Sequence, residues 1–266
     1  MPTLKGPIQF TGTLDELIAY KTKHSDKIIV RRKPFISKDA YKKAPQYAAM
    51  RQNSAEFTGA AYAGKMVRMA LGPLMQLADY NMTPALNSFC RAIQQRDTWG
   101  KRGQRAICFS THKEAFGSLV FTKQYHFDSI FKQRPVAELL REKAELHIQL
   151  NELVPGFNFY QPWNKAYFRI IGCMGAIEDL HFTDKGYDKR HQQTLLPNAT
   201  VYSDWMPSGK KVNAHSMMIR LPNPELLQQE TTSLLGAIGI QMGQAGLFGE
   251  INPVKYASTA RILAAC

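Results

Sequence analysis

The chain has little cysteine. Four of its 266 residues are Cys, at positions 90, 108, 173 and 266, and no two of them form a C-x-x-C pair. This spacing argues against a zinc knuckle and against a dense disulfide framework, because both need closely paired cysteines. We therefore expect a protein of a reducing, cytoplasmic compartment.

Long apolar runs are also missing. The longest candidate, Leu234–Met242, is much shorter than the ~18 residues that a bilayer-spanning helix needs. The opening MPTLKGPIQF does not place a charged segment before an apolar one, as a secretory signal does. The sequence thus predicts no association with a membrane.

Linear catalytic signatures are absent. The chain contains no G-x-S-x-G, no H-E-x-x-H and no phosphate-loop spacing, and the His112-Lys113-Glu114 run lacks the downstream P-C-x-x-C of a zinc deaminase. We expect a protein that is not an enzyme and that uses no cofactor. If it is an enzyme instead, the ionisable group to inspect lies around His112, His126 and Asp128.

One segment offers metal-ligand atoms. His181, Asp184, Asp188 and His191 follow one another at short spacing, but Gly186 between them predicts a hairpin turn. The four side chains would converge only if the strand register placed them on one face. We assign no metal to them.

Acidic residues are scarce in the first half of the chain. Residues 1–134 contain 22 Lys and Arg against 9 Asp and Glu, whereas residues 135–266 contain 12 of each. The formal charge of +13 therefore belongs to the first half. A one-sided excess of this kind predicts docking on an anionic partner. It also favours two domains, a basic hairpin-and-helix region at 1–134 and a neutral β-rich domain at 135–266.

The basic half predicts a β-hairpin followed by helices. Residues 17–22 and 27–32 are expected to pair as strands, and Gln46–Leu71 is expected to form the longest helix. One stripe of that helix holds residues at alternating three and four spacing: Tyr47, Met50, Ser54, Phe57, Ala61, Gly64 and Leu71. Small residues at 59, 60, 63 and 64 would let another backbone approach closely. A further helix is expected from Thr83 or Pro84 to Gln95.

The neutral half predicts short strands separated by turns. The expected strands cover residues 106–110, 118–122, 145–150, 166–171, 176–183, 200–204, 215–221 and 234–242, with a short helix at 136–143. Several short strands with such punctuation favour an antiparallel β-sandwich. The fold class expected for the whole chain is α+β.

The first 70 residues resemble the opening of an uncharacterised bacterial protein family. The resemblance rests on GPIQFTGTL, SDKIIVR and a helix of the type Tyr-x-x-x-Arg-x-Asn-x-x-Glu-Phe with a downstream Ala-Gly-Lys-x-x-Arg. The matching positions are Tyr47, Arg51, Asn53, Glu56, Phe57, Ala63, Gly64, Lys65 and Arg68. Lys33-Pro34-Phe35 departs from the family, which commonly has glycines there. The resemblance implies no activity.

Two sets of cations are candidates for nucleic-acid binding. Lys65 and Arg68, at i and i+3 of the long helix, would present two positive charges to phosphates. The loop from Arg96 to Arg105 adds a tryptophan. There, Trp99 would stack on an unpaired base while Lys101, Arg102 and Arg105 hold the backbone. Alternatively, Trp99 packs under the sandwich, and the helical charges are structural.

Arg51 and Glu56 carry a structural expectation. They are five residues apart and so make a poor pair within the helix. Ion pairs that hold the hairpin or another helix are the favoured role.

The sequence therefore predicts a binding protein whose basic half docks on DNA or RNA. The alternative is a structural subunit of a larger assembly or homo-oligomer, in which the basic half meets an acidic protein surface.

Overall fold

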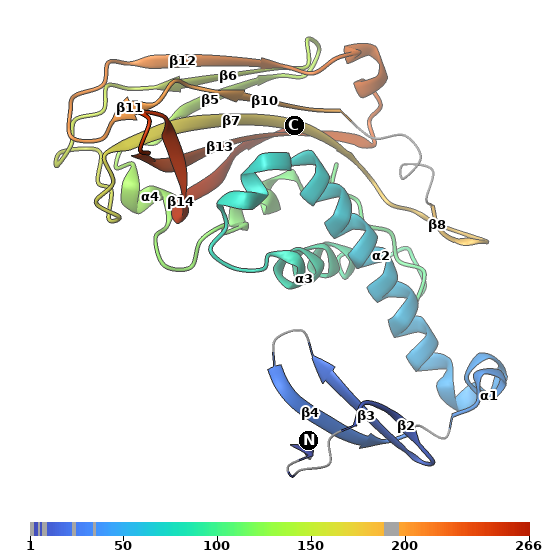
Figure 1. The fold of residues 1–266 in the computed structure, drawn as a ribbon. Coiled ribbons are helices and arrows are strands. Elements are labelled where there is room, and N and C mark those ends of the chain that lie inside the picture. The colour runs from blue at the N-terminus through green and yellow to red at the C-terminus, as the bar shows by residue number, and fades with distance from the viewer. Residues whose placement is uncertain (1–2, 5, 7–9, 23–24, 34–35, 189–196) are drawn as a thin grey trace. The chain divides into compact units, whose positions relative to one another are not determined.

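The chain forms two compact units, Met1–Arg51 and Gln52–Cys266. A computed structural model describes residues 3–4, 6, 10–22, 25–33, 36–188 and 197–266 (Figure 1). The boundary expected near residue 134 falls inside the second unit. Helices from the basic half share one hydrophobic core there with strands from the neutral half. The net charge consequently divides almost evenly, with +7 on the first unit and +6 on the second.

The first unit is a small antiparallel sheet followed by short helices. Its strand order is β1-β4-β3-β2, from β1 (Thr3–Leu4), β2 (Gly12–Leu14), β3 (Leu17–Thr22) and β4 (Ser25–Arg32). The predicted hairpin is confirmed, because β3 pairs with β4 from Leu17 opposite Arg32 onward. The sequence also suggested a turn at His24-Ser25-Asp26, but Ser25 and Asp26 belong to β4, and His24 lies outside the described residues. Next come α1 (Lys38–Lys43), which the Ser37 hydroxyl caps by accepting from the N–H of Ala40 at 3.1 Å, and η1 (Pro45–Tyr47).

Two helices of the second unit lie close to their predicted bounds: α2 (Ala48–Ala70), which begins in the first unit, and α3 (Thr83–Gln94). Three short helices were not predicted: η2 (Gly72–Leu77), η3 (Lys113–Ser118) and α4 (Phe127–Ile130). The predicted stripe on α2 is only partly buried: Gly64 and Leu71 are buried, whereas Met50 and Phe57 are exposed. The small residues at 59, 60, 63 and 64 are all buried. Gly64 packs against α3 so closely that a β-carbon there would lie 2.8 Å from the Asn87 side chain.

Most of the strands belong to two antiparallel sheets. The first contains β7 (Tyr167–Glu178), β10 (Asn198–Tyr202), β11 (Met206–Pro207), β13 (Thr232–Ala245) and β14 (Ile251–Ala265), with β7 and β13 at its centre. The second has the order β12-β6-β5, from β12 (His215–Arg220), β6 (Glu145–Leu150) and β5 (Val136–Leu140). The pair β8 (Phe182–Thr183) and β9 (Gly186–Tyr187) and the short η4 (Pro224–Leu227) complete the unit.

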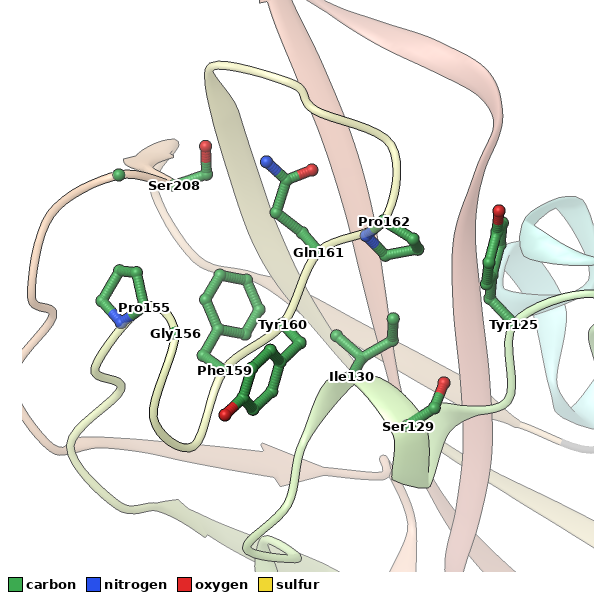
Figure 2. A pocket seen from close by; sticks show the side chains of 11 residues that line it. Tyr125, Ser129, Ile130, Pro155, Gly156, Phe159, Tyr160, Gln161, Pro162 and Ser208 are labelled. Atoms are coloured by element: carbon green, nitrogen blue, oxygen red, sulfur yellow. The ribbon is translucent and has the colours of Figure 1, made fainter.

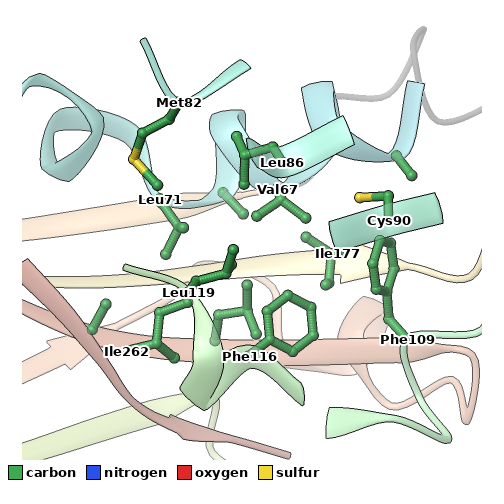
Figure 3. Packing of buried hydrophobic residues seen from close by; sticks show 14 of the residues in the cluster. Val67, Leu71, Met82, Leu86, Cys90, Phe109, Phe116, Leu119, Ile177 and Ile262 are labelled. Atoms are coloured by element: carbon green, nitrogen blue, oxygen red, sulfur yellow. The ribbon is translucent and has the colours of Figure 1, made fainter. Parts of the chain in front are cut away.

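The second unit has three layers (Figure 1). The two sheets face each other across one core, in which Ile148 and Ile219 of the smaller sheet meet Met174 and Ile238 of the larger. The helices cover the other face of the larger sheet and enclose a second core (Figure 3), where Val67, Leu86 and Phe116 pack toward Ile177. Strand β7 is buried on both faces, and so it reads as a continuous apolar run. The α+β class is confirmed.

Several predicted elements differ from the structure. Residues 106–110 and 118–122 do not form the expected strands: Ile107 makes one isolated bridge to Leu180, and Ser118 ends η3. The apolar side chains of both ranges enter the helical core. Residues 136–140 form β5 instead of a helix, and β14 was not predicted. The two strands expected at 166–171 and 176–183 are largely one, β7. None of the helices in the described part of the chain is both long and apolar enough to cross a bilayer.

Candidate nucleic-acid interface

The loop after α3 is closed by one carboxylate. Asp97 Oδ1 accepts hydrogen bonds from the backbone N–H of Trp99 at 2.9 Å and of Gly100 at 3.0 Å. Its Oδ2 accepts from the N–H of Ala106 at 2.7 Å, across the mouth of the loop. Partial burial raises the pKa of Asp97, but these three N–H donors and the nearby Arg105 outweigh it, so the pKa lies below its ordinary value. The loop is thus held in one conformation by an ionised side chain.

Two glycines let the loop turn this tightly. Gly103 has φ +91°, and a β-carbon there would lie within about 3.0 Å of Gln52 on α2. At Gly100 a β-carbon would lie 2.5 Å from the carboxylate of Asp97. The two glycines therefore serve a fixed, close-packed loop.

A buried carboxylate anchors the loop to α2. Glu56 is 3% exposed, and its Oε1 accepts from the N–H of Gly103 at 2.9 Å. The Nη1 of Arg105 lies 3.8 Å from the same oxygen, so the charge of Glu56 is compensated. The sequence suggested that Glu56 pairs with the hairpin or with another helix, whereas its partners in the structure are in the loop.

Two residues that the sequence did not single out complete this anchor. Gln94 donates to the hydroxyl of Tyr187 at 2.7 Å and to the carbonyl of Glu56 at 3.2 Å. The hydroxyl of Tyr187 donates in turn to the carbonyl of Arg105 at 2.7 Å. Burial raises the pKa of Tyr187 to about 12, so the hydroxyl keeps its proton and remains a donor. Gln94 and Tyr187 are 93 residues apart in the sequence, and only the tertiary structure brings them into contact.

Above this anchor the loop presents an aromatic ring and two cations to solvent. The side chain of Trp99 is 96% exposed, which rules out the alternative that it packs under the sandwich. Lys101 and Arg102 are also exposed, and Arg102 Nη2 donates to Asn53 Oδ1 at 3.2 Å, which orients its guanidinium. Arg105 is the exception. It is half-buried against Glu56 and belongs to the anchor, not to the free surface.

Lys65 and Arg68 do not lie with the loop. Both are exposed on α2, and Arg68 Nη1 donates to Thr83 Oγ1 at 3.0 Å. Lys65 follows Glu56 by nine residues, which displaces it about 14 Å along the helix axis and roughly half a turn around it. The structure therefore separates the two sets of cations that the sequence suggested.

Arg51 has a local role within the first unit. Its Nη1 donates to the carbonyls of Tyr41 at 2.6 Å and Ala44 at 3.0 Å, at the C-terminal end of α1. A cation is a favourable partner for carbonyls at the C-terminal end of a helix; the carbonyl of Ala44 accepts also from the N–H of Tyr47 at 3.2 Å. Arg51 thus ties α1 to the start of α2.

The ionisable residues suggested for an enzyme belong to separate clusters. His112 lies beside Arg96 and Glu114, whereas Asp128 binds Arg134 at 3.0 Å and Arg261. His126 precedes α4, and its carbonyl accepts from Ser129. Within the described ranges, no three His, Cys, Asp or Glu side chains are grouped to hold a metal ion. His191 of the sequence candidate lies outside those ranges.

No protein-family model matches the chain, and no curated protein or solved structure matches it. The resemblance of the first 70 residues to a bacterial family stays a prediction. The function is therefore inferred from the geometry of the loop.

Proposed function

We propose that the protein binds single-stranded nucleic acid, without catalysing a reaction, through the surface formed by Trp99, Lys101 and Arg102. An unpaired base stacks on the indole of Trp99, and the two cations contact the flanking phosphates. Stacking tolerates any base because every base has a π-face, so the recognition is independent of sequence. Duplex DNA keeps its bases stacked on one another and offers Trp99 no free face.

The main support for the proposal is an almost fully exposed tryptophan on a fixed loop. Trp99 is 96% exposed, although Trp is among the side chains most useful for burial. The loop beneath it is held by the hydrogen bonds of Asp97 and Glu56. Because the loop is already ordered, binding a ligand there loses little further backbone entropy.

The charge around the loop suits a polyphosphate chain. The second unit carries 23 Lys and Arg against 17 Asp and Glu. The one acidic side chain inside the loop, Asp97, is occupied by three backbone donors. It therefore opposes an incoming phosphate less than a free carboxylate would.

Titration of a fluorescent single strand across a salt series tests the proposal. The affinity of a single strand falls with a slope of about −0.7 per phosphate contact on a log–log plot. Lys101→Ala together with Arg102→Ala should weaken binding and flatten that slope by about 1.4. The matched control is Lys210→Ala with Lys211→Ala, which removes the same charge from another exposed segment.

Two outcomes would contradict the proposal. One is an unchanged slope in the loop variant. The other is an equal loss in the loop and control variants, which would mean that overall charge and not this surface attracts the strand. Binding of an acidic protein but of no polynucleotide would show that the loop binds a protein partner instead.

A further inference from the structure

A second exposed apolar feature lies at the turn between β13 and β14. The side chains of Leu247 and Phe248 are 96% and 94% exposed. We call these two residues the apolar tip. Single exposed apolar residues are common on protein surfaces, whereas an adjacent pair of large exposed apolar side chains is typical of a contact surface.

The turn that carries the apolar tip is rigid. Glu250 accepts from the N–H of Phe248 at 3.1 Å and from the side-chain amide of Asn252 at 3.1 Å, and Gly246 N–H donates to the Glu250 carbonyl at 2.7 Å. Backbone and side-chain donors lower the pKa of Glu250, so it is an anion at neutral pH. Gly249 supplies the positive φ of +85° that closes the turn. The tip thus consists of two apolar side chains beside a fixed negative charge.

A pocket of about 580 Å³ opens on the same unit (Figure 2). Its apolar wall comes from Tyr125, Ile130, Pro155, Phe159, Tyr160 and Pro162. Among the described residues that line it there is no Lys, Arg, Asp, Glu or His. A cation lies beside one lining side chain, because Lys132 Nζ is 5.6 Å from the centre of the Tyr160 ring. A pocket of this kind accepts uncharged apolar groups and favours an anion beside them.

Hydrogen bonds place the pocket and the apolar tip at one end of the second unit. Two pocket residues, Gln161 and Ser208, donate to the carbonyl of Lys165. The ammonium of Lys165 donates to Gln244 Oε1 at 3.4 Å. Gln244 is only two residues before Gly246, where the turn begins. The tip does not occupy the pocket of its own chain, since both of its side chains are exposed.

We propose that a second copy of this chain is the occupant of the pocket: Leu247 and Phe248 of each copy insert into the aromatic pocket of the other. The apolar pair matches a pocket lined without charges, and Glu250 of one copy meets Lys132 of the other. Because both features lie at one end of the unit, a two-fold axis at that end can bring each tip to the pocket of the other copy, which closes the assembly as a dimer. The dimer does not depend on nucleic-acid binding.

Sedimentation equilibrium of the full chain, freed of nucleic acid by nuclease, tests the dimer. Wild type should dimerise reversibly, and a tip variant, Leu247→Ser with Phe248→Ser, should raise the dimer Kd at least tenfold. A pocket variant, Ser129→Arg, should do the same by placing a charge in the apolar pocket. Met218→Ser, which changes an exposed side chain on β12, is the matched control and should leave Kd unchanged. Trp99→Ala should also leave it unchanged, which separates this test from that of the nucleic-acid surface.

Mixing the two defective variants gives the decisive result. A mixed dimer contains one intact tip facing one intact pocket, whereas neither variant alone has such a pair. An equimolar mixture should therefore associate more tightly than either variant by itself. A wild type that stays monomeric up to its solubility limit would overturn the proposal, as would a tip variant that dimerises like wild type or a mixture no tighter than its components. Capture of lipid vesicles by a monomeric wild type would assign the tip to a membrane surface instead.

Discussion

Replacement of Trp99 by alanine gives the sharpest test of the nucleic-acid surface. Stacking of one base on an aromatic side chain contributes about 1–3 kcal/mol. Since about 1.4 kcal/mol corresponds to a tenfold change in Kd, Trp99→Ala should weaken single-strand binding by about 5- to 160-fold. The folded state should hardly change, because a side chain that is 96% exposed contributes little packing.

The assay is fluorescence anisotropy with a labelled mixed-sequence single strand at two salt concentrations. Stacking is not an ionic contact, so Trp99→Ala should lower affinity by the same factor at both concentrations. Lys101→Ala should instead lose more at low salt than at high salt. Trp99→Phe should recover part of the affinity, because a smaller ring still stacks. Tyr256→Ala removes another exposed aromatic ring, from β14, and serves as the matched control.

Wild-type affinity of Trp99→Ala for single strands would show that Trp99 is not part of the binding surface. A loss equal to that of Tyr256→Ala would show the same, since any exposed ring would then act alike. Thermal unfolding of each variant must accompany the titration. A Trp99→Ala protein that unfolds at a much lower temperature would show that the side chain stabilises the loop instead of serving as a binding surface.

Three further predictions concern the architecture of the loop. Gly103→Ala should destabilise the protein by about 1–3 kcal/mol, because the residue has a positive φ and its β-carbon would press on Gln52; urea unfolding measures this, and an unchanged midpoint would contradict it. Glu56→Ala should lower the free energy of unfolding by about 1–3 kcal/mol, because the N–H of Gly103 and part of Arg105 lose their buried partner. The same variant should lose single-strand binding at a temperature where it is still folded. Asp97→Asn should lower the melting temperature at pH 7. The difference in melting temperature from wild type should shrink as the pH falls below about 4, because a carboxyl group whose pKa is lowered in the folded state stabilises the protein above its unfolded pKa and loses this contribution when it is protonated. A difference that stays constant from pH 7 to pH 3 would exclude this role of the charge.

Local sequence determined many elements correctly. The pairing of β3 with β4, the span of β6 and the helix from Thr83 follow from β-branched runs, alternation and Pro84 in a first turn. The small residues of α2 were also identified as a packing surface, and Gly59 and Gly64 are indeed buried. These features depend on neighbours within a few residues, which is why periodicity and propensity suffice.

Other elements depend on contacts that no local pattern reveals. Strand β14 contains several alanines, which have low β-propensity, yet it pairs with β13 along most of its length. The face that α2 buries is set by a close approach to Tyr187 and α3, so Phe57 is exposed although its spacing suggested a core stripe. The chain also joins the helices to the sheet in one core, which moves the boundary between units from 134 to 51.

For the candidate site, the sequence alone determined the composition of the loop: one tryptophan, several cations and two glycines within ten residues. It did not determine which of these groups face solvent. The tertiary structure decided that Trp99, Lys101 and Arg102 are displayed, while Arg105 is turned inward to Glu56. The physical reason is that a buried carboxylate needs donors and a compensating charge. Its partners come from residues 47 and 49 positions away along the chain, at a separation where spacing in the sequence carries no information.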